Sequence, residues 1–172
     1  MRKNYFSKTF KALLAIVSCC AFMNVWAIEI HVQKAGTLPT LLPTCSESTL
    51  KVTGTINGTD VKHLRQLIGA GVTSLDLAGV KIVSGGVAYD GTNKTENDVI
   101  GTAMFKECTK LRSIELPTSI SAIHSNAFAR SGLTKVDIPN SVSRLGGDAF
   151  AYCNSLNTVV IGSRVSKLDQ GV

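Results

Sequence analysis

Cysteine is scarce in this chain, which has only five in 172 residues. Cys19 and Cys20 lie near the N-terminus, and Cys45, Cys108 and Cys153 follow. An odd, sparse set of three does not make the disulfide framework that small secreted domains use. Because no Cys-x-x-Cys or His-x-x-x-His pair accompanies them, the sequence also argues against a structural zinc site.

The short motifs that support catalysis are missing as well. The sequence contains no Gly-x-Ser-x-Gly elbow, no phosphate-binding glycine loop and no His-Glu-x-x-His pair. We therefore expect no enzymatic activity, no cofactor and no bound metal.

Acidic residues are missing from the first 27 residues, which instead have the layout of an export signal. Four basic residues come first, an apolar run covers residues 12–25, and Val25 and Ala27 suit the positions that signal peptidase reads. The run is too short for a membrane span, which needs about 20 residues. Residues 16–19 also resemble a bacterial lipobox, which would leave a lipid on Cys19. This alternative is less favoured because the apolar run continues past Cys19. We expect a secreted or cell-surface protein.

Charge then excludes a class of partner. Without the signal, 14 basic and 12 acidic residues remain, for a net charge of +2. So small an excess gives no reason to expect nucleic acid as a partner. We also expect no transmembrane helix in the mature chain.

A repeat is visible from residue 100 onward. Three Ala-Phe pairs end at Phe105, Phe128 and Phe150, spaced 23 and 22 residues apart. The single Gly132 replaces residues 109–110 of the first unit, which accounts for the missing residue. A period of this length lies in the range of leucine-rich repeats.

Each unit also contains the pattern Leu-x-x-Ile-x-Leu. Leu111, Ile114 and Leu116 should point inward from a strand that Pro117 ends, and the Ala-Phe segment should turn on the far side. One coil cannot bury its own apolar face, but stacked coils can. We predict a β-rich solenoid of parallel strands, one per 22–23-residue coil.

These motifs together resemble the BspA-like leucine-rich repeats of bacterial surface proteins, over residues 100–172. Segments 35–38, 54–60 and 74–79 also resemble the leader of such proteins in Bacteroides-type bacteria. The resemblance implies a module for adhesion or protein binding, whose partner is a host or microbial surface protein or glycan. A structural envelope protein, or a non-functional fragment of a longer repeat protein, remains the alternative.

The region before the repeats reads as a small α/β N-terminal cap over residues 28–71. Asp60 can accept hydrogen bonds from the free amides of a helix start. Val61, Leu64 and Ile68 then share one face of that helix, which the glycines at 69 and 71 close.

The repeats should occupy residues 72–172, with an inserted loop within 78–98. Glycines at 85, 86 and 91 predict that this loop lies at the surface. It is rich in oxygen ligands that suit calcium, but their spacing fits no defined calcium loop, so a flexible polar loop is favoured. These ligands are Asp90, Asn93, Glu96, Asn97 and Asp98.

The outward positions of the strands form our candidate ligand-binding face. Its carboxylates should stand about 4.8 Å apart in successive coils. An ordinary solvated surface with local ion pairs is the alternative. The candidate residues are Ser74, Asp76, Arg112, Ser113, Glu115, Lys135, Asp137 and Thr158.

Two cysteines occupy equivalent repeat positions. Ser131 takes the same position in the coil between Cys108 and Cys153. Two coils separate the sulfur atoms by roughly 10 Å, which a disulfide cannot span. We expect free thiols that pack inward.

The last repeat is incomplete. Leu168 opens a fourth unit whose Phe would follow Val172. We expect this open end to fray from Leu156 onward or to self-associate. The residues expected to be exposed there are Leu156, Val159, Ile161 and Val165.

The mature N-terminus is predicted to be Ile28, because Val25 and Ala27 fit the peptidase best at that cut. The intact mass of the exported protein measures this directly. A mass that begins at a lipid-modified Cys19 would contradict both the cut and the soluble assignment.

Overall fold

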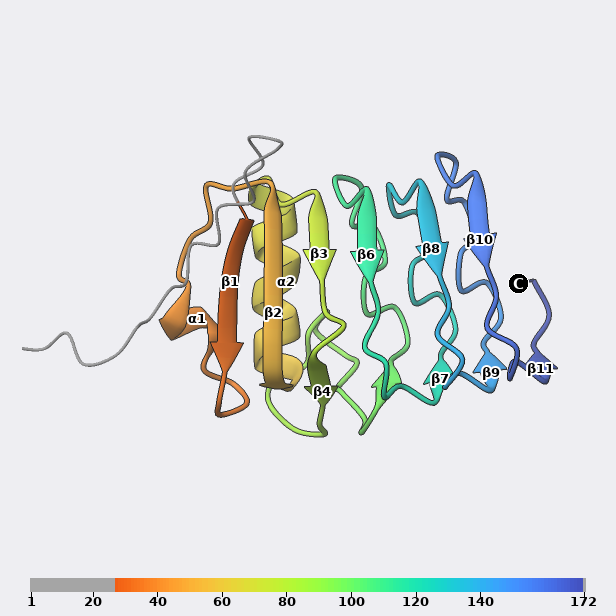
Figure 1. Cartoon of the computed structure of the whole chain (residues 1–172), viewed down its shortest axis with the longest axis horizontal. Coiled ribbons are helices and arrows are strands. Elements are labelled where there is room, and N and C mark those ends of the chain that lie inside the picture. The colour runs from red at the N-terminus through yellow and green to blue at the C-terminus, as the bar shows by residue number, and fades with distance from the viewer. Residues whose placement is uncertain (1–26, 172) are drawn as a thin grey trace, which may run out of the picture.

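The computed structural model describes residues 27–171 and places their strands in two sheets (Figure 1). The larger sheet has the order β1-β2-β3-β6-β8-β10, with β4 beside β2, and the smaller has the order β11-β9-β7-β5. Strand partners are parallel throughout. The larger sheet consists of β1 (Ala27–Val32), β2 (Thr49–Ile56), β3 (Ser74–Asp76), β4 (Val80–Ile82), β6 (Ser113–Glu115), β8 (Lys135–Asp137) and β10 (Thr158–Val160). The smaller consists of β5 (Val99–Ile100), β7 (Ala122–Ile123), β9 (Arg144–Leu145) and β11 (Lys167–Leu168).

The inward and outward assignment of the repeat strands is confirmed. Ile114 and Val136 are buried, whereas Glu115 and Asp137, one position further along each strand, are exposed. Leu111 and Leu116 are buried as well. Successive coils align, since β6 pairs with β8 and β8 with β10 in parallel register. The repeat region is therefore a stack of coils around a shared apolar interior.

The expectation of a single strand per coil is wrong. Each coil also contributes a two-residue strand to the smaller sheet, in which Ile100, Ile123 and Leu145 pair in succession. A strand of two residues has only one inward side chain, so it shows no alternation that a sequence pattern could reveal. Figure 1 shows the smaller sheet along the lower edge of the coils, beyond the ends of β6, β8 and β10.

The Ala-Phe segments stack the coils from within. The ring of Phe128 lies 5.6 Å from that of Phe105 and 5.3 Å from that of Phe150, in nearly parallel planes. Phe105 and Phe128 are fully buried. Their backbones continue the stack, because the N–H of Phe105 donates to Ala127 and that of Phe128 to Ala149.

Each of these turns holds two residues in the left-handed backbone region. They lie two positions before and two positions after each Phe, with φ between 56° and 62°. This conformation is unfavourable for residues other than glycine, so the stacked neighbours must hold it in place. The six residues are Ala103, Asn126, Asp148, Glu107, Arg130 and Tyr152.

The N-terminal region adds α1 (Leu38–Leu41) and α2 (Gly58–Ala70) behind the larger sheet (Figure 1). Its strands β1 and β2 extend the repeat sheet, since β2 pairs with β3. One core cluster runs from Ile30 to Ala149 without a break. The boundary between cap and repeats at residue 71 remains a prediction.

Asp60 accepts from a backbone amide at the start of α2, as predicted, although it is not the N-cap residue. The N-cap of α2 is Asn57, whose side chain accepts from the amide of Thr59, and Asp60 occupies the third helical position. Its buried carboxylate accepts from the N–H groups of Gly36, Leu38 and Asn57. Asp60 therefore ties α1 to α2 as well as capping α2. The apolar face is as predicted, because Val61, Leu64 and Ile68 are buried.

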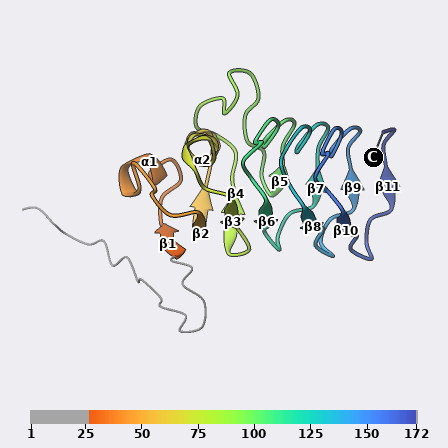
Figure 2. The same cartoon turned by 90° about the horizontal axis from the view of Figure 1, so that it is seen from above.

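The insertion between residues 77 and 99 is only partly a surface loop. Val80 and Ile82 are buried in β4, which pairs with β2. Tyr89 is buried as well and donates a 2.7 Å hydrogen bond to the carbonyl of Thr102. Burial is the main cause that raises the pKa of Tyr89 above its usual value. The glycines and polar residues of this segment predicted a loop and gave no sign that Val80, Ile82 and Tyr89 are buried. Figure 2 shows the rest of the insertion projecting beyond α2.

Two further expectations concern the predicted export signal and membrane-spanning helices. Residues 1–26 of the predicted export signal, Cys19 among them, lie outside the described residues, whereas Ala27 is the first residue of β1. Among residues 27–171, no helix has the length and apolar character that crossing a membrane requires.

Replacing Phe128 by Ala should lower the free energy of unfolding by about 3 to 5 kcal/mol, because it empties the middle of the ring stack. Denaturant unfolding monitored by circular dichroism measures this. Tyr152→Ala is the matched control, since the Tyr152 side chain is 72% exposed. Equal loss from the two variants would contradict the assignment of Phe128 to the core.

Candidate functional site

The predicted face is one surface of the larger sheet. Register places Lys51 beside Asp76 and Asp76 beside Glu115. Because Ser113 pairs with Lys135, the same register sets Asp137 opposite Glu115. Seven of the eight candidate residues thus lie together in two rows, and their role in binding remains a prediction. One row, called the outer row below, lies at the C-terminal residue of each strand and comprises Asp76, Glu115 and Asp137. The second row lies at the first residue of each strand and comprises Ser74, Ser113, Lys135 and Thr158.

Arg112 does not belong to this face. It directly precedes β6, and its guanidinium donates a 3.1 Å hydrogen bond to the carbonyl of Gly132 in the next coil. The side chain therefore lies at the edge where the strands begin. The sequence suggested it as a cation that could offset the carboxylates, but β6 begins only at Ser113.

The face extends further toward the N-terminus than the sequence analysis predicted. Glu29 on β1 pairs with Lys51 on β2, so both continue the outer row. The alternation of β1, in which Ile30 and Val32 are buried and Glu29 is half-buried, was a usable signal for this.

Ion pairs neutralise part of the face. Lys51 lies 3.2 Å from Glu29, and Lys135 lies 2.9 Å from Asp137. The first pair is partly exposed and the second largely exposed to solvent, so both contribute little to stability. Asp76 and Glu115, side by side, make no ion pair within residues 27–171. The centre of the face therefore carries unpaired negative charge.

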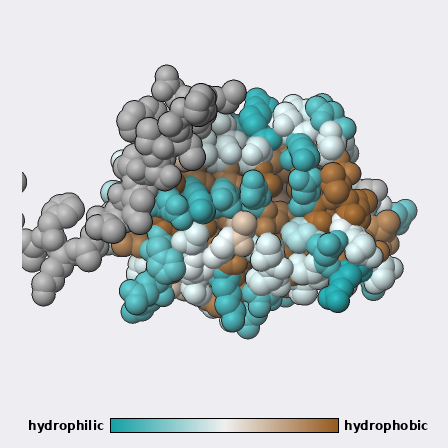
Figure 3. Space-filling model, in the orientation of Figure 1, coloured by the Kyte–Doolittle hydropathy of each residue, from teal (hydrophilic) through white to brown (hydrophobic). Residues whose placement is uncertain are grey.

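The colouring of Figure 3 divides this surface into two parts. Hydrophilic side chains cover much of the sheet, and apolar ones gather at the end where β10 lies. The exposed apolar residues of that end are Val159, Val160, Ile161 and Leu168. Leu156 and Val165, which were expected to be exposed as well, are partly buried against the core.

The cysteines are unpaired within the described part of the chain. Cys108 is buried as predicted, and burial raises the pKa of its thiol to about 11, so the reactive thiolate is rare at neutral pH. Cys153 is only half-buried; its thiol donates to the carbonyl of Phe128 and lies 3.3 Å from the Ser131 hydroxyl. Neither contact supplies a base that could activate the sulfur.

Hydrogen bonds within the inserted loop occupy several of its oxygen atoms. Asp90 accepts from the amides of Thr92 and Asn93, and Asn97 accepts from the amide of Ser84. Partial burial acts to raise the pKa of Asp90, but hydrogen bonds from Asn93 and Thr92 outweigh it and lower the pKa below its usual value. No group of three or more His, Cys, Asp or Glu side chains within residues 27–171 is arranged to hold a metal ion.

Comparison with known proteins identifies the repeats. Residues 92–172 match the family described as "BspA type Leucine rich repeat region", in six copies. No curated protein matches the chain.

Two solved structures are similar to part of the chain. One is a leucine-rich cell surface protein from Faecalibacterium prausnitzii A2-165, with 23% identity over 66% of this chain and 23% of that one, at a TM-score of 0.41. The other is a leucine-rich repeat protein from Bacteroides ovatus ATCC 8483, with 24% identity over 65% of this chain and 25% of that one, at a TM-score of 0.37. The chain spans about a quarter of the length of these two proteins.

Proposed function

Because residues 92–172 match the BspA-type leucine-rich repeat family, we propose that the chain is an exported binding module of the secreted or cell-surface kind. Its ligand is a protein or glycan on a host or microbial surface. The open face of the larger sheet makes the contact, and the chain performs no catalysis.

The observation that carries this proposal is the row of polar side chains that continues across successive strands. Parallel register brings together outward residues that lie far apart in sequence, such as Asp76 and Glu115. The coils bury their inward residues, so the outward ones can vary without cost to the core. A rigid surface of this kind suits recognition of a macromolecule better than that of a small molecule.

Charge favours a partner with basic side chains. Carboxylates outnumber basic groups in the outer row, and the adjacent Asp76 and Glu115 lack ion pairs in the described residues. A lysine or arginine of the partner between them would relieve their mutual repulsion. The excess of carboxylates therefore favours a protein over a glycan as the ligand of this face.

A structural envelope role with no ligand is the second candidate. The ion pairs Lys51–Glu29 and Lys135–Asp137 favour it, because a solvated face satisfies its charges locally in this way. A binding module should retain purified host matrix proteins or mucus glycans saturably, whereas a structural element should retain none.

Reversing charge at Glu115 and Asp137 to lysine should weaken binding to a captured partner by about tenfold or more, because the face then repels basic groups. The thermal midpoint of unfolding should stay unchanged, since both side chains are exposed. Affinity is measured by surface plasmon resonance and folding by circular dichroism.

Glu96→Lys supplies the control for this experiment. Glu96 is an exposed acidic residue of the inserted loop, away from the sheet face. Affinity that falls equally in the control would show a general charge effect and overturn the assignment of the face. Loss of fold in the Glu115 and Asp137 variants would overturn it too.

We also propose that the chain self-associates through its C-terminal coil. β10 and β11 lie at the edges of their sheets, where Val160 and Ile161 are about half exposed. Within residues 27–171, edge strands beside exposed apolar side chains favour pairing with a second copy. Val160→Glu with Ile161→Glu should therefore shift a dimer to a monomer in sedimentation velocity, whereas Val87→Glu, at an equally exposed loop valine, should not.

Hydrogen exchange gives the independent measurement. Residues 156–168 should exchange slowly in the associated form and rapidly in the double variant. Strong protection of these residues in a demonstrated monomer would contradict the proposal.

A further inference from the structure

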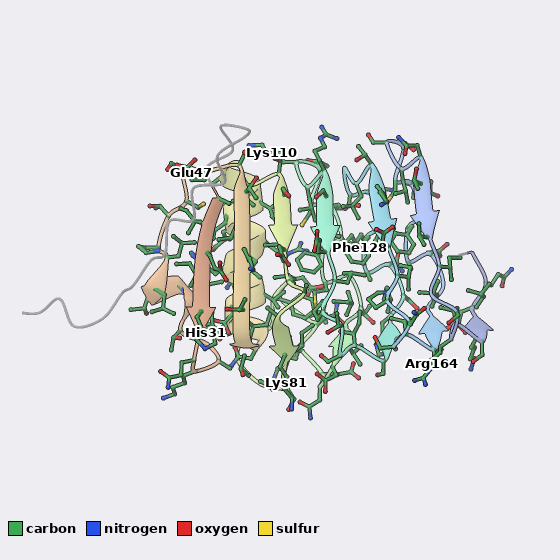
Figure 4. The ribbon with its side chains drawn as sticks, in the orientation of Figure 1. His31, Glu47, Lys81, Lys110, Phe128 and Arg164 are labelled. Carbon is green, nitrogen blue, oxygen red and sulfur yellow. The ribbon has the colours of Figure 1, made fainter. Side chains whose placement is uncertain are left out.

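A polar hollow opens at the edge of the larger sheet where the repeat strands begin. It lies across three successive turns, before β6, β8 and β10, and encloses about 500 Å³. Figure 4 locates this edge. Lys110, which follows the lining residue Thr109 in the sequence, lies at the upper edge of the sheet, and Arg164 lies near the lower edge. Basic, aromatic and small polar side chains line it, among them Arg112, Arg130, Tyr152, Thr109, Asn154 and Ser155.

The hollow coincides with the one-residue deletion in the repeat. Gly132 alone stands where residues 109–110 and 154–155 form the longer turns of the neighbouring coils. A side chain at Gly132 would meet the carbonyl oxygen of Thr109 at 2.1 Å and the guanidinium of Arg112 at 2.9 Å. The middle turn is thus short and bare, and the two longer turns enclose the space above it.

Two guanidinium groups reach this space. Arg112 is fixed by its hydrogen bond to the Gly132 carbonyl, and Arg130 lies over the ring of Tyr152, 5.2 Å from its centre. Neither arginine makes an ion pair within residues 27–171, and no acidic residue lines the hollow. A planar guanidinium group without a counter-charge suits a carboxylate or sulfate, which it can bind through two parallel hydrogen bonds.

The other lining groups indicate what carries the anion. Tyr152 exposes 72% of its surface and offers an aromatic edge or face to an apolar patch. Thr109, Ser155 and Asn154 add hydroxyl and amide groups that can donate to and accept from ligand hydroxyls. A ring with both hydroxyl groups and C–H faces uses all of these, whereas an isolated phosphate ion would leave the aromatic and amide groups idle.

We propose that this hollow is a binding site for an anionic sugar residue, a carboxylated or sulfated unit of a glycan. Arg112 and Arg130 hold the acidic group, Tyr152 contacts the ring, and the short turn at Gly132 makes the room. The site is separate from the strand face and does not depend on the function proposed for that face.

The test compares four probes by isothermal titration with the purified chain: sialyllactose, lactose monosulfate, uncharged lactose and a hexaglutamate peptide. At least one of the charged lactoses should bind saturably, and uncharged lactose about tenfold more weakly or not at all. The carboxylated and sulfated probes separate the two sources of the anionic group.

Variants then locate the site. Arg112→Gln, Arg130→Gln and Tyr152→Ala should each reduce affinity for the charged lactose by about tenfold. Arg164→Gln is the control, because it removes an exposed arginine near the opposite edge of the sheet and should leave affinity unchanged. Thermal unfolding confirms that the variants fold, and the exposed Tyr152 supplies one that does not touch the core.

Several results would overturn the proposal. Binding of uncharged lactose as tight as that of the charged probes removes the anion requirement, and equal loss in Arg164→Gln shows attraction by net charge alone. Saturable binding of hexaglutamate without either charged lactose assigns the hollow to a protein ligand, and no binding of any probe excludes the sugar site. The Glu115 and Asp137 variants should bind the charged lactose with unchanged affinity. A failure of this proposal can therefore be told apart from a failure of the proposal for the strand face.

Discussion

The repeat coils of this protein bury their apolar side chains by stacking on their neighbours. The rings of Phe105, Phe128 and Phe150 stack at 5.3 to 5.6 Å, and backbone N–H groups around Phe105 and Phe128 donate to the next coil. These contacts hold six residues in left-handed backbone conformations that a lone turn would not keep. Coil stacking therefore determines both the core and the shape of the turns.

The outer surface follows from the same constraint. Parallel register keeps equivalent positions in line, so any outward side chain acquires neighbours from coils about 22 residues away. Asp76 and Glu115 meet although 39 residues separate them, because the insertion between them leaves the strand register intact. Charge at one outward position consequently acts together with charge in adjacent coils.

Sequence patterns predicted the structural features that recur in every coil and missed the features that depend on a single contact. The inward positions of Ile114 and Val136 were readable because they recur at a fixed period. Buried Tyr89 and the three amides bound by Asp60 occur once each, so no repetition reveals them. Arg112 was misplaced because it precedes β6, where the alternation of a strand no longer fixes the direction of a side chain.

The deletion at Gly132 shows how such a fold can change one surface at a time. A lost residue within a strand would reverse every later side chain between core and solvent. Here the loss falls in a turn, and β6, β8 and β10 keep their register on both sides of it. The backbone closes up until Gly132 lies so near Thr109 that no side chain fits, and the space left above the short turn is the polar hollow. Turn length can therefore shape the sheet edge independently of the strand face, because β6, β8 and β10 stay in register.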